Sequence, residues 1–491
     1  MLTSEGGVKS LSELGLTGPS DLRIAGLAVD NRRAGPGDLF AALPGSVTHG
    51  ARFAPDAVER GAVAILTDRA GAATLENLSV PVLTVEDPRA ALAFAAALMA
   101  GSQPETMVAV TGTNGKTSVA AFVRQIWEAL GLSAVNIGTT GVEGAWTAPS
   151  PHTTPEPITL HRMLAEMAQA GVTHAAMEAS SHGLDQRRLE AVRLAAAGFT
   201  NLTQDHLDYH GDMDSYFAAK AGLFDRLLPG DGVAVVNLDD PRGPDLAAAC
   251  EARGQEVIGV GRNEAARLRL TGQRFDATGQ EVLFRWQGRA RSVRLDLIGG
   301  FQAANALIAA GLAIGAGEEA ERVFGVLPSL RGVRGRMELA ATRENGAAVF
   351  VDYAHTPDAV ATAIQALRPH VMGRLVAIVG AGGDRDRGKR PLMGAAAHAH
   401  ADSVIVTDDN PRSEEPAAIR AAVMEGAPGA IEIGDRAEAI LRGAGMLEPG
   451  DTLLVMGKGH ETGQTVGDMV LPFDDVEQAS ISVAALEGRE V

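Results

Sequence analysis

The stretch Val108–Ser118 constrains the fold more than any other part of the 491-residue chain. It opens as a valine-rich apolar run, which is typical of a strand buried in a parallel sheet. The run breaks at Gly112, turns through Asn114-Gly115 and reaches Lys116-Thr117, after which apolar residues recur at helical spacing until Gly131. Strand, glycine turn, Lys-Thr and helix together predict a phosphate-binding loop, although a tight turn with a solvated lysine is an alternative.

The loop is a short form of the phosphate-binding pattern, because Val110 stands where the longer form has a glycine. Backbone N–H groups of such a loop approach the phosphates, the lysine reaches the terminal phosphates, and the Thr117 hydroxyl faces Mg²⁺. The predicted phosphate-binding residues are Gly112, Thr113, Asn114, Gly115, Lys116, Thr117 and Ser118.

Composition narrows the class of protein. The formal net charge of −18 argues against a nonspecific binder of nucleic acid or of an anionic membrane surface. The single cysteine, Cys250, cannot form an internal disulfide, which fits a reducing compartment. The residues after Met1 lack the pattern of a signal peptide, and the apolar run Ala90–Ala100 is too short to span a bilayer. We therefore expect a cytoplasmic protein without membrane insertion, and a monomer.

Alternating strand-like and helix-like runs predict an α/β chain of three units, covering residues 1–102, 103–338 and 339–491. The central unit should hold a mostly parallel sheet. The part from about residue 257 to 298, including the run 258–260, is predicted as shorter antiparallel strands. The third unit shows a doubly wound pattern.

Two groups in the central unit could take part in metal or phosphate chemistry. Glu178 ends a predicted strand, so it should lie on the same sheet edge as the phosphate loop, where its carboxylate suits Mg²⁺. A role beside a helix N-terminus fits its spacing equally well. His206 and His210 are four residues apart and could share a helix face, but the region lacks the other ligands of a zinc site. A hydrogen-bonded loop histidine is the simpler interpretation.

Lys220 falls in an apolar helical stripe with Tyr216, Phe217, Leu223 and Phe224. Burying an ammonium group is costly, so the usual solution is a side chain that extends to water. The alternative is a lysine that is paired or chemically modified at a site.

Three polar loops follow predicted strands in the third unit, at residues 382–391, 408–412 and 457–461. Each mixes cations with carboxylates. That combination suits a zwitterion, whose carboxylates meet arginine and whose ammonium groups meet Asp or Glu. Solvated loops are the alternative for each loop taken alone.

These motifs, taken together and in this order, resemble those of the Mur ligase family over almost the whole length. The resemblance rests on residues 112–117, 177–183, 205–210, 335–338, 352–357 and 457–461. It implies three domains: one that binds the UDP-substrate, a central P-loop ATPase domain, and a Rossmann-like C-terminal domain that binds the incoming amino acid.

The resemblance also implies roles for single residues. Lys116, Glu178, His206 and Lys220 would be catalytic. Mg²⁺ would be held by Thr117, Glu178, His206 and a carbamylated Lys220. Further ATP contacts would come from Asn305, Arg336, Asp352 and His355. The UDP-peptide would meet Asn31, Ser46, Val47, Thr48, Thr153, Thr154, Ser180, Gln186 and Arg188. The amino acid would meet Arg385, Asp409, Asn410, Pro411, Arg412, Gly457 and Glu461.

Members of the family with Asp-Asn-Pro-Arg at residues 409–412 take meso-diaminopimelate, whose distal carboxylate Arg412 can bind bidentately. The implied function is an ATP-dependent amide ligase that adds meso-diaminopimelate to UDP-MurNAc-L-Ala-D-Glu in peptidoglycan precursor synthesis. Alternatives are a lysine-adding ligase of the same family, a folate polyglutamate ligase, and a nucleotide-binding scaffold without catalysis.

Overall fold

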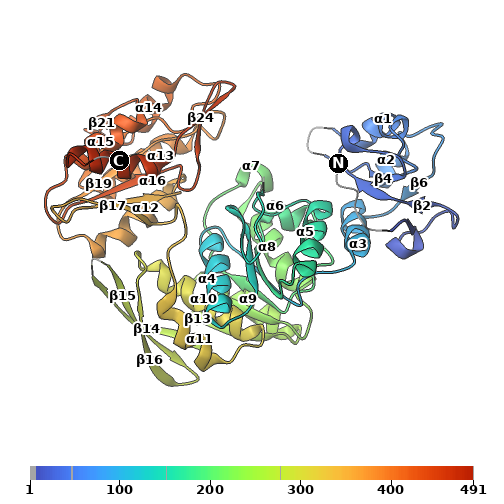
Figure 1. The fold of residues 1–491 in the computed structure, drawn as a ribbon, viewed down its shortest axis with the longest axis horizontal. Coiled ribbons are helices and arrows are strands. Elements are labelled where there is room, and N and C mark those ends of the chain that lie inside the picture. Colours follow the sequence, from blue (N-terminus) through green and yellow to red (C-terminus); the bar gives the residue numbers. More distant parts are fainter. Residues whose placement is uncertain (1–6, 46–47, 151, 277, 490–491) are drawn as a thin grey trace.

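The computed structural model describes residues 7–45, 48–150, 152–276 and 278–489. The described chain is α/β, as predicted, and Figure 1 shows three lobes, with the N-terminal and C-terminal lobes on opposite sides of the central one. We define the lobes by their elements: β1 to α3, β7 to α11, and β17 to α16.

The N-terminal lobe is built around a parallel four-stranded sheet of order β3-β4-β5-β6. Its last helix, α3, starts directly after Asp87, whose carboxylate accepts hydrogen bonds from the backbone N–H groups of Arg89 and Ala90. Its elements are β1 (Lys9–Ser10), β2 (Arg23–Ile24), β3 (Gly26–Ala28), β4 (Asp38–Ala41), α1 (Ala54–Glu59), β5 (Ala64–Thr67), α2 (Arg69–Ala72), β6 (Val82–Thr84) and α3 (Pro88–Ala100).

The central lobe contains a ten-stranded sheet among the described residues, of order β16-β15-β14-β13-β12-β11-β7-β10-β8-β9. Helix α10 is buried along most of its length and packs against both this sheet and helix α4, which also packs on the sheet. The strands are β7 (Thr106–Thr111), β8 (Ala134–Gly138), β9 (Gly141–Gly144), β10 (His174–Glu178), β11 (Ala196–Phe199), β12 (Val233–Asn237), β13 (Glu256–Gly261), β14 (Leu268–Asp276), β15 (Gly279–Trp286) and β16 (Arg289–Leu295).

The helices of this lobe include the predicted one after the phosphate loop. They are α4 (Lys116–Ala129), α5 (Pro157–Gln169), α6 (Ser181–Asp185), α7 (Leu207–His210), α8 (Met213–Gly222), α9 (Gly243–Ala252), α10 (Phe301–Gly315) and α11 (Ala320–Val326).

The prediction of antiparallel strands after residue 257 is wrong for the first of them. β13 pairs in parallel with β12 and extends the central sheet, and only β14, β15 and β16 pair antiparallel with one another. The reason lies in the connection: helix α9 joins β12 to β13, and a helical crossover returns the chain parallel to the preceding strand.

The C-terminal lobe has a six-stranded sheet of order β17-β18-β22-β19-β20-β21, parallel except for β17, and a separate hairpin of β23 and β24. Helices cover both faces, as the doubly wound pattern predicts. The elements are β17 (Glu338–Thr342), β18 (Ala348–Asp352), α12 (Pro357–Leu367), β19 (Leu375–Val379), α13 (Lys389–His400), β20 (Ser403–Val406), α14 (Pro416–Met424), β21 (Ile431–Glu432), α15 (Arg436–Gly445), β22 (Thr452–Met456), β23 (Gly463–Val466), β24 (Met469–Pro472) and α16 (Asp475–Leu486).

Candidate active site

The predicted phosphate loop joins β7 to α4 and depends on its two glycines. Gly112 has φ of 146°, and a Cβ there would lie 1.9 Å from Oγ1 of Thr200. Gly115 has φ of 88°, and a Cβ there would lie 2.7 Å from Oδ1 of Asn305. Larger residues would therefore be strained and would clash at both positions. The loop is also held in place, since the Asn114 backbone N–H donates to Oδ1 of Asn201 over 2.9 Å.

Two lysines converge on one carbonyl of this loop. Nζ of Lys116 lies 2.8 Å from the Gly112 carbonyl oxygen, and Nζ of Lys220 lies 2.7 Å from the same atom. Lys220 is 1% exposed and its ammonium sits 4.4 Å from the centre of the Tyr216 ring. Of the two alternatives for Lys220, the side chain that extends to water is wrong, because helix α8 aims the side chain inward at the loop. Burial, and then the charge of Lys116, hold the pKa of Lys220 well below its usual value.

Glu178 lies beside the phosphate loop, because β10 pairs in parallel with β7 and sets Glu178 opposite Val110. Its buried carboxylate accepts hydrogen bonds from the Thr117 hydroxyl over 3.1 Å and from the Thr139 backbone N–H over 2.8 Å. The capping role at α6 belongs to Ser180, whose hydroxyl accepts from the Gly183 backbone N–H. Glu178 therefore faces the loop, with Thr117 as its neighbour.

His206 and His210 do not share a helix face. His206 precedes α7 as its N-cap with φ of 53°, and His210 ends that helix. Both rings instead approach His182, with centroids 4.8 and 5.6 Å away. Burial, opposed by Asp205, lowers the pKa of His206 to about 4. Among the described residues no three His, Cys, Asp or Glu side chains gather closely enough to hold a metal ion by themselves.

Most residues predicted to bind the UDP-peptide form one group beside Glu178. The Thr154 hydroxyl donates to the Glu178 carbonyl over 2.9 Å and accepts from the Ser180 backbone N–H. The Arg188 guanidinium donates to the Thr154 carbonyl over 2.7 Å and to Oε1 of Gln186 over 2.8 Å. Thr153 joins the group through Thr139, whose hydroxyl lies 3.0 Å from its own.

The remaining predicted UDP-peptide residues belong to the N-terminal lobe. Asn31 donates to Asp56 and Thr48 is exposed, and no hydrogen bond among the described residues joins either one to the central group. Ser46 and Val47 lie outside the described residues.

The residues predicted to bind ATP outside the loop lie where the central and C-terminal lobes meet. Nη2 of Arg336 lies 3.4 Å from Oγ1 of Thr117, and its guanidinium stacks 4.5 Å from the centre of the Tyr353 ring. The Asp352 carboxylate accepts from the backbone N–H groups of Met337 and Ala354, and burial raises its pKa. Arg336 thus connects the phosphate loop to the C-terminal lobe.

Asn305 and His355 are held on either side of this junction. The Asn305 amide lies under the phosphate loop at Gly115 and donates to Gln302 over 3.0 Å. Nδ1 of His355 lies 2.8 Å from the Tyr353 carbonyl oxygen, and the Lys389 ammonium donates to the His355 carbonyl over 3.0 Å.

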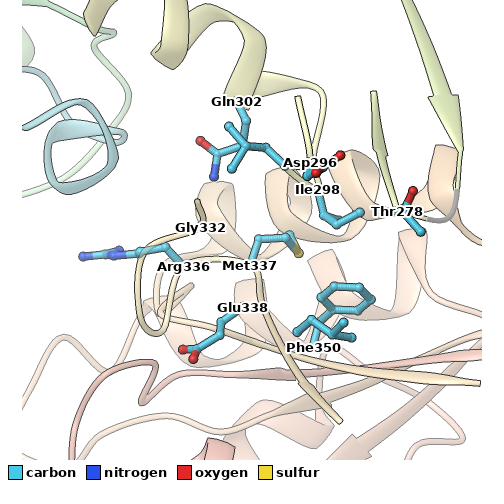
Figure 2. A pocket seen from close by; sticks show the side chains of 11 residues that line it. Thr278, Asp296, Ile298, Gln302, Gly332, Arg336, Met337, Glu338 and Phe350 are labelled. Carbon is cyan, nitrogen blue, oxygen red and sulfur yellow. The ribbon is translucent and has the colours of Figure 1, made fainter. Parts of the chain in front are cut away.

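A cavity of about 280 Å³ opens at the same junction. Figure 2 shows apolar side chains of Ile298, Met337 and Phe350 on one part of its wall, with Gln302 and Arg336 on another. Its lining comes from the end of the central sheet, the start of α10 and the first strands of the C-terminal lobe. The cavity therefore adjoins the predicted nucleotide contacts through Arg336.

The predicted amino-acid-binding residues of the C-terminal lobe come together at the ends of β20 and β22. The exception is Arg385, which lies exposed in the loop between β19 and α13. Asp409 is 8% exposed, and its carboxylate has no hydrogen bond or ion pair within the part of the chain that the structure describes. Gly457 leaves room for that carboxylate, since a Cβ there would lie 2.4 Å from its Oδ2. Nη1 of Arg412 donates to the Gly383 carbonyl over 2.8 Å, which leaves its other N–H groups available.

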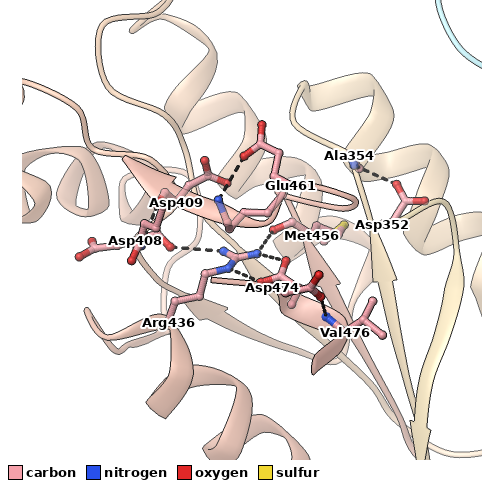
Figure 3. Close-up of polar contacts among 12 residues, drawn as sticks. Asp352, Ala354, Asp408, Asp409, Arg436, Met456, Glu461, Asp474 and Val476 are labelled. Atoms are coloured by element: carbon pink, nitrogen blue, oxygen red, sulfur yellow. Dashed lines mark hydrogen bonds and ion pairs between the residues drawn. The ribbon is translucent and has the colours of Figure 1, made fainter. Parts of the chain in front are cut away.

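Sequence reasoning missed the buried cations behind this group. Arg436 is 2% exposed and makes a double hydrogen bond to Asp475, and it also donates to the carbonyls of Asp408 and Met456. Figure 3 shows its guanidinium group hydrogen-bonded to Asp408 and Met456, the first of which precedes Asp409 in the chain. Burial alone would lower the pKa of Arg436, but Asp475 and then Asp409 raise it. No motif marks Arg436, whereas the other missed cation, Lys458, stands inside the quoted stretch 457–461.

Comparisons with known proteins agree along the whole chain. Family models described as "Mur ligase family, catalytic domain", "Mur ligase middle domain" and "Mur ligase, glutamate ligase domain" match residues 23–99, 110–313 and 335–459. The UDP-N-acetylmuramoyl-L-alanyl-D-glutamate–2,6-diaminopimelate ligase of Bradyrhizobium diazoefficiens is 53% identical over 94% of this chain and 96% of its own length. The ligase of the same name from Caulobacter vibrioides is 51% identical over 96% of each chain.

A solved structure under the same ligase name superimposes with a TM-score of 0.72 at 32% identity, covering 98% of this chain and 100% of that one. Across the described ranges, no helix is both long and apolar enough to cross a membrane.

Proposed function

The chain belongs to the Mur ligase family, and we propose that it joins meso-2,6-diaminopimelate to the D-glutamyl γ-carboxylate of UDP-MurNAc-L-Ala-D-Glu. ATP is the co-substrate and ADP and phosphate are released. The observation that carries the proposal is the position of Arg336, which connects Thr117 of the phosphate loop with the lobe that bears Asp409 and Arg412. One lobe thus presents phosphate-binding groups and the next presents groups for a zwitterion.

The reaction has two steps. An oxygen of the γ-carboxylate attacks the γ-phosphorus of ATP, the bond to the bridging oxygen breaks, and an acyl phosphate and ADP result. A neutral amine of diaminopimelate then attacks the acyl carbon, phosphate leaves, and the amine proton is lost. Lys116 and the loop N–H groups hold the phosphates, and Arg336 adds positive charge beside Thr117.

The oxygens of Thr117 and Glu178, 3.1 Å apart, would hold a hard cation such as Mg²⁺, which prefers oxygen ligands. When bound, Mg²⁺ would neutralise the charge that develops on the phosphates. His206 and Lys220 are the proposed holders of a second ion. Lys220 suits that role only as a carbamate, because an ammonium group has no lone pair to donate.

The surroundings of Lys220 support carbamylation. A lowered pKa increases the neutral fraction of the amine, and a neutral amine can attack CO₂, forming an N–C bond and releasing one proton. The product is an anion beside Lys116, so the carbamate is attracted to the charge that disfavours an ammonium group at Lys220.

The central group beside Glu178 is proposed to hold the UDP-peptide with its γ-carboxylate near the phosphate loop. Thr154, Gln186 and Arg188 belong to this group. The N-terminal residues Asn31, Ser46, Val47 and Thr48 are proposed to meet the uridine end.

Amino-acid selection is proposed to rest on the two sides of the C-terminal site. The Asp409 carboxylate meets an ammonium group, and Glu461 lies beside it (Figure 3). Arg412 and the exposed Arg385 meet the carboxylates. A lysine-adding ligase remains the second candidate, and Arg412 argues against it because L-lysine lacks the distal carboxylate.

The test is phosphate release with ATP, Mg²⁺ and UDP-MurNAc-L-Ala-D-Glu, comparing meso-diaminopimelate, L-lysine and no amino acid. We expect release that depends on diaminopimelate and a tripeptide product by mass spectrometry. Release with lysine alone would overturn the substrate assignment. Release with neither would overturn the proposed ligase function.

A further inference from the structure

Lys458 is fully buried between the end of β22 and the hairpin of β23 and β24. Its ammonium donates to Oδ1 of Asn410 over 3.3 Å, to Oε2 of Glu461 over 3.1 Å, and to the Gly463 carbonyl. An ammonium group has three N–H donors, so every one of them is used inside the protein. Lys458 is therefore in no position to bind a substrate itself.

The side-chain amide oxygen of Asn410 is also fully engaged by contacts within the protein. Its Oδ1 accepts from the Thr465 backbone N–H over 2.8 Å as well as from Lys458, and its Nδ2 donates to Oε2 of Glu461 over 2.8 Å. Both lone pairs of the oxygen are occupied, so this amide cannot receive an ammonium group of a ligand. What it does instead is fix the distance between its own loop and Glu461.

The hairpin holds the same loop from the other side. Nε2 of Gln464 donates to the Asp409 carbonyl over 2.7 Å, the Arg412 backbone N–H donates to the Thr465 carbonyl over 3.0 Å, and the Gly467 N–H donates to the Arg412 carbonyl over 2.8 Å. Arg412 has φ of 50°, a conformation that a non-glycine residue keeps only where its surroundings enforce it. The hairpin supplies that enforcement.

We infer that Lys458 and Gln464 are positioning residues that act through the Asn410 loop and set the separation between the acidic side of the amino-acid site, at Asp409 and Glu461, and its basic side, at Arg412. This separation is what distinguishes an amino acid with a distal carboxylate from one without. The inference rests on the proposed function, and it assigns specificity to residues that do not touch the substrate.

Two substitutions test it, with one control. Lys458→Met removes the ammonium and keeps the length of the side chain, and Gln464→Leu removes one hydrogen bond in a half-buried place. Met469→Gln, on the outer strand of the same hairpin and 62% exposed, is the control. We expect KM for diaminopimelate to rise about 10-fold or more in Lys458→Met and about 3- to 10-fold in Gln464→Leu. KM for ATP and for the UDP-substrate should stay at the wild-type value, and the preference for diaminopimelate over L-lysine should fall.

Different results would overturn the proposed ligase function and the positioning role of Lys458 and Gln464. If the wild-type protein releases no phosphate with diaminopimelate, the proposed function fails and the inference falls with it. If the wild-type protein is active and Gln464→Leu keeps both its KM for diaminopimelate and its preference over lysine, the positioning role is overturned alone. A parallel rise of all three KM values in Gln464→Leu would overturn it too, because a general structural defect would then explain the result.

Discussion

The central and C-terminal lobes each bury a lysine next to a ligand-binding loop, and the two lysines have opposite surroundings. Lys220 has one carbonyl acceptor, an aromatic ring, and the second ammonium of Lys116 on that same carbonyl. Lys458 has three acceptors, one of which is the carboxylate of Glu461. Both side chains are at most 1% exposed, so exposure alone does not separate them.

The difference teaches how to distinguish a reactive lysine from a positioning one. A buried cation without a counter-charge is pushed toward its neutral form, which is a nucleophile. A buried cation with a full set of acceptors keeps its place and orients its partners. On this basis Lys220 is proposed to be the group that is chemically modified, and Lys458 is inferred to be the group that keeps a site in its geometry.

The largest expected effect comes from Lys220→Met. We expect kcat to fall about 1,000-fold or more, equivalent to about 4 kcal/mol of transition-state stabilisation, because the anionic carbamate is lost. Added formate or acetate should restore part of the activity by supplying a carboxylate in its place. Phosphate release measures both effects. Lys458→Met is the control and should show no rescue, and full activity of Lys220→Met without any addition would contradict the carbamate role.

A second prediction concerns the buried ion pair of Arg436 and Asp475 in the C-terminal lobe. Asp475→Asn leaves the buried Arg436 without its counter-charge and should lower the free energy of unfolding by about 3 kcal/mol. The double variant Arg436→Met with Asp475→Leu should recover most of that loss, since it removes both charges. Urea denaturation checks both values. If Asp475→Asn lowers the free energy of unfolding by less than about 1 kcal/mol, the ion pair of Arg436 and Asp475 does not stabilise this lobe as predicted.

Several features of these two lobes could be predicted from the sequence. The phosphate loop, the edge on which Glu178 lies and the three polar loops of the last unit follow from strand-end positions in parallel sheets. The direction of the Lys220 side chain could not be predicted, because an apolar stripe fits both a side chain that extends to water and one that points inward. The hydrogen-bond partners of Arg436 and Lys458 could not be predicted from the sequence either, since tertiary packing between segments far apart in the chain sets them. The domain boundaries and the roles of the site residues stay predictions.

A smaller effect is expected at the basic side of the amino-acid site. Arg412→Lys exchanges a two-pronged guanidinium for a single point charge, so KM for diaminopimelate should rise about 10- to 30-fold. Activity toward L-lysine should hardly change. Arg387→Lys is the matched control, because Arg387 is 76% exposed on the neighbouring loop and pairs with Glu414. Equal losses with both amino acids would remove Arg412 from the account of specificity.

The last effect is a dependence of the free energy of unfolding on pH. Burial lowers the pKa of His460 to about 4, with a further contribution from Arg336. Because the folded-state value lies below that of the unfolded chain, near 6.5, folding favours the neutral ring. The stabilising contribution is present above pH about 6.5 and is lost as pH falls toward 4. NMR titration of the His460 ring, assigned with His460→Gln, should show this low midpoint, and a midpoint near 6.5 would contradict it.

The contrast between the two lysines is tested most directly by trapping the acyl phosphate without any amino acid. Hydroxylamine converts an acyl phosphate to a hydroxamate, so the assay contains ATP, Mg²⁺, UDP-MurNAc-L-Ala-D-Glu and hydroxylamine. We predict that Lys458→Met forms hydroxamate at the wild-type rate but ligates diaminopimelate only with a raised KM, and that Lys220→Met forms almost no hydroxamate and almost no tripeptide. If Lys220→Met forms hydroxamate at the wild-type rate, Lys220 is not required for acyl phosphate formation, and the proposed contrast between the two lysines is wrong.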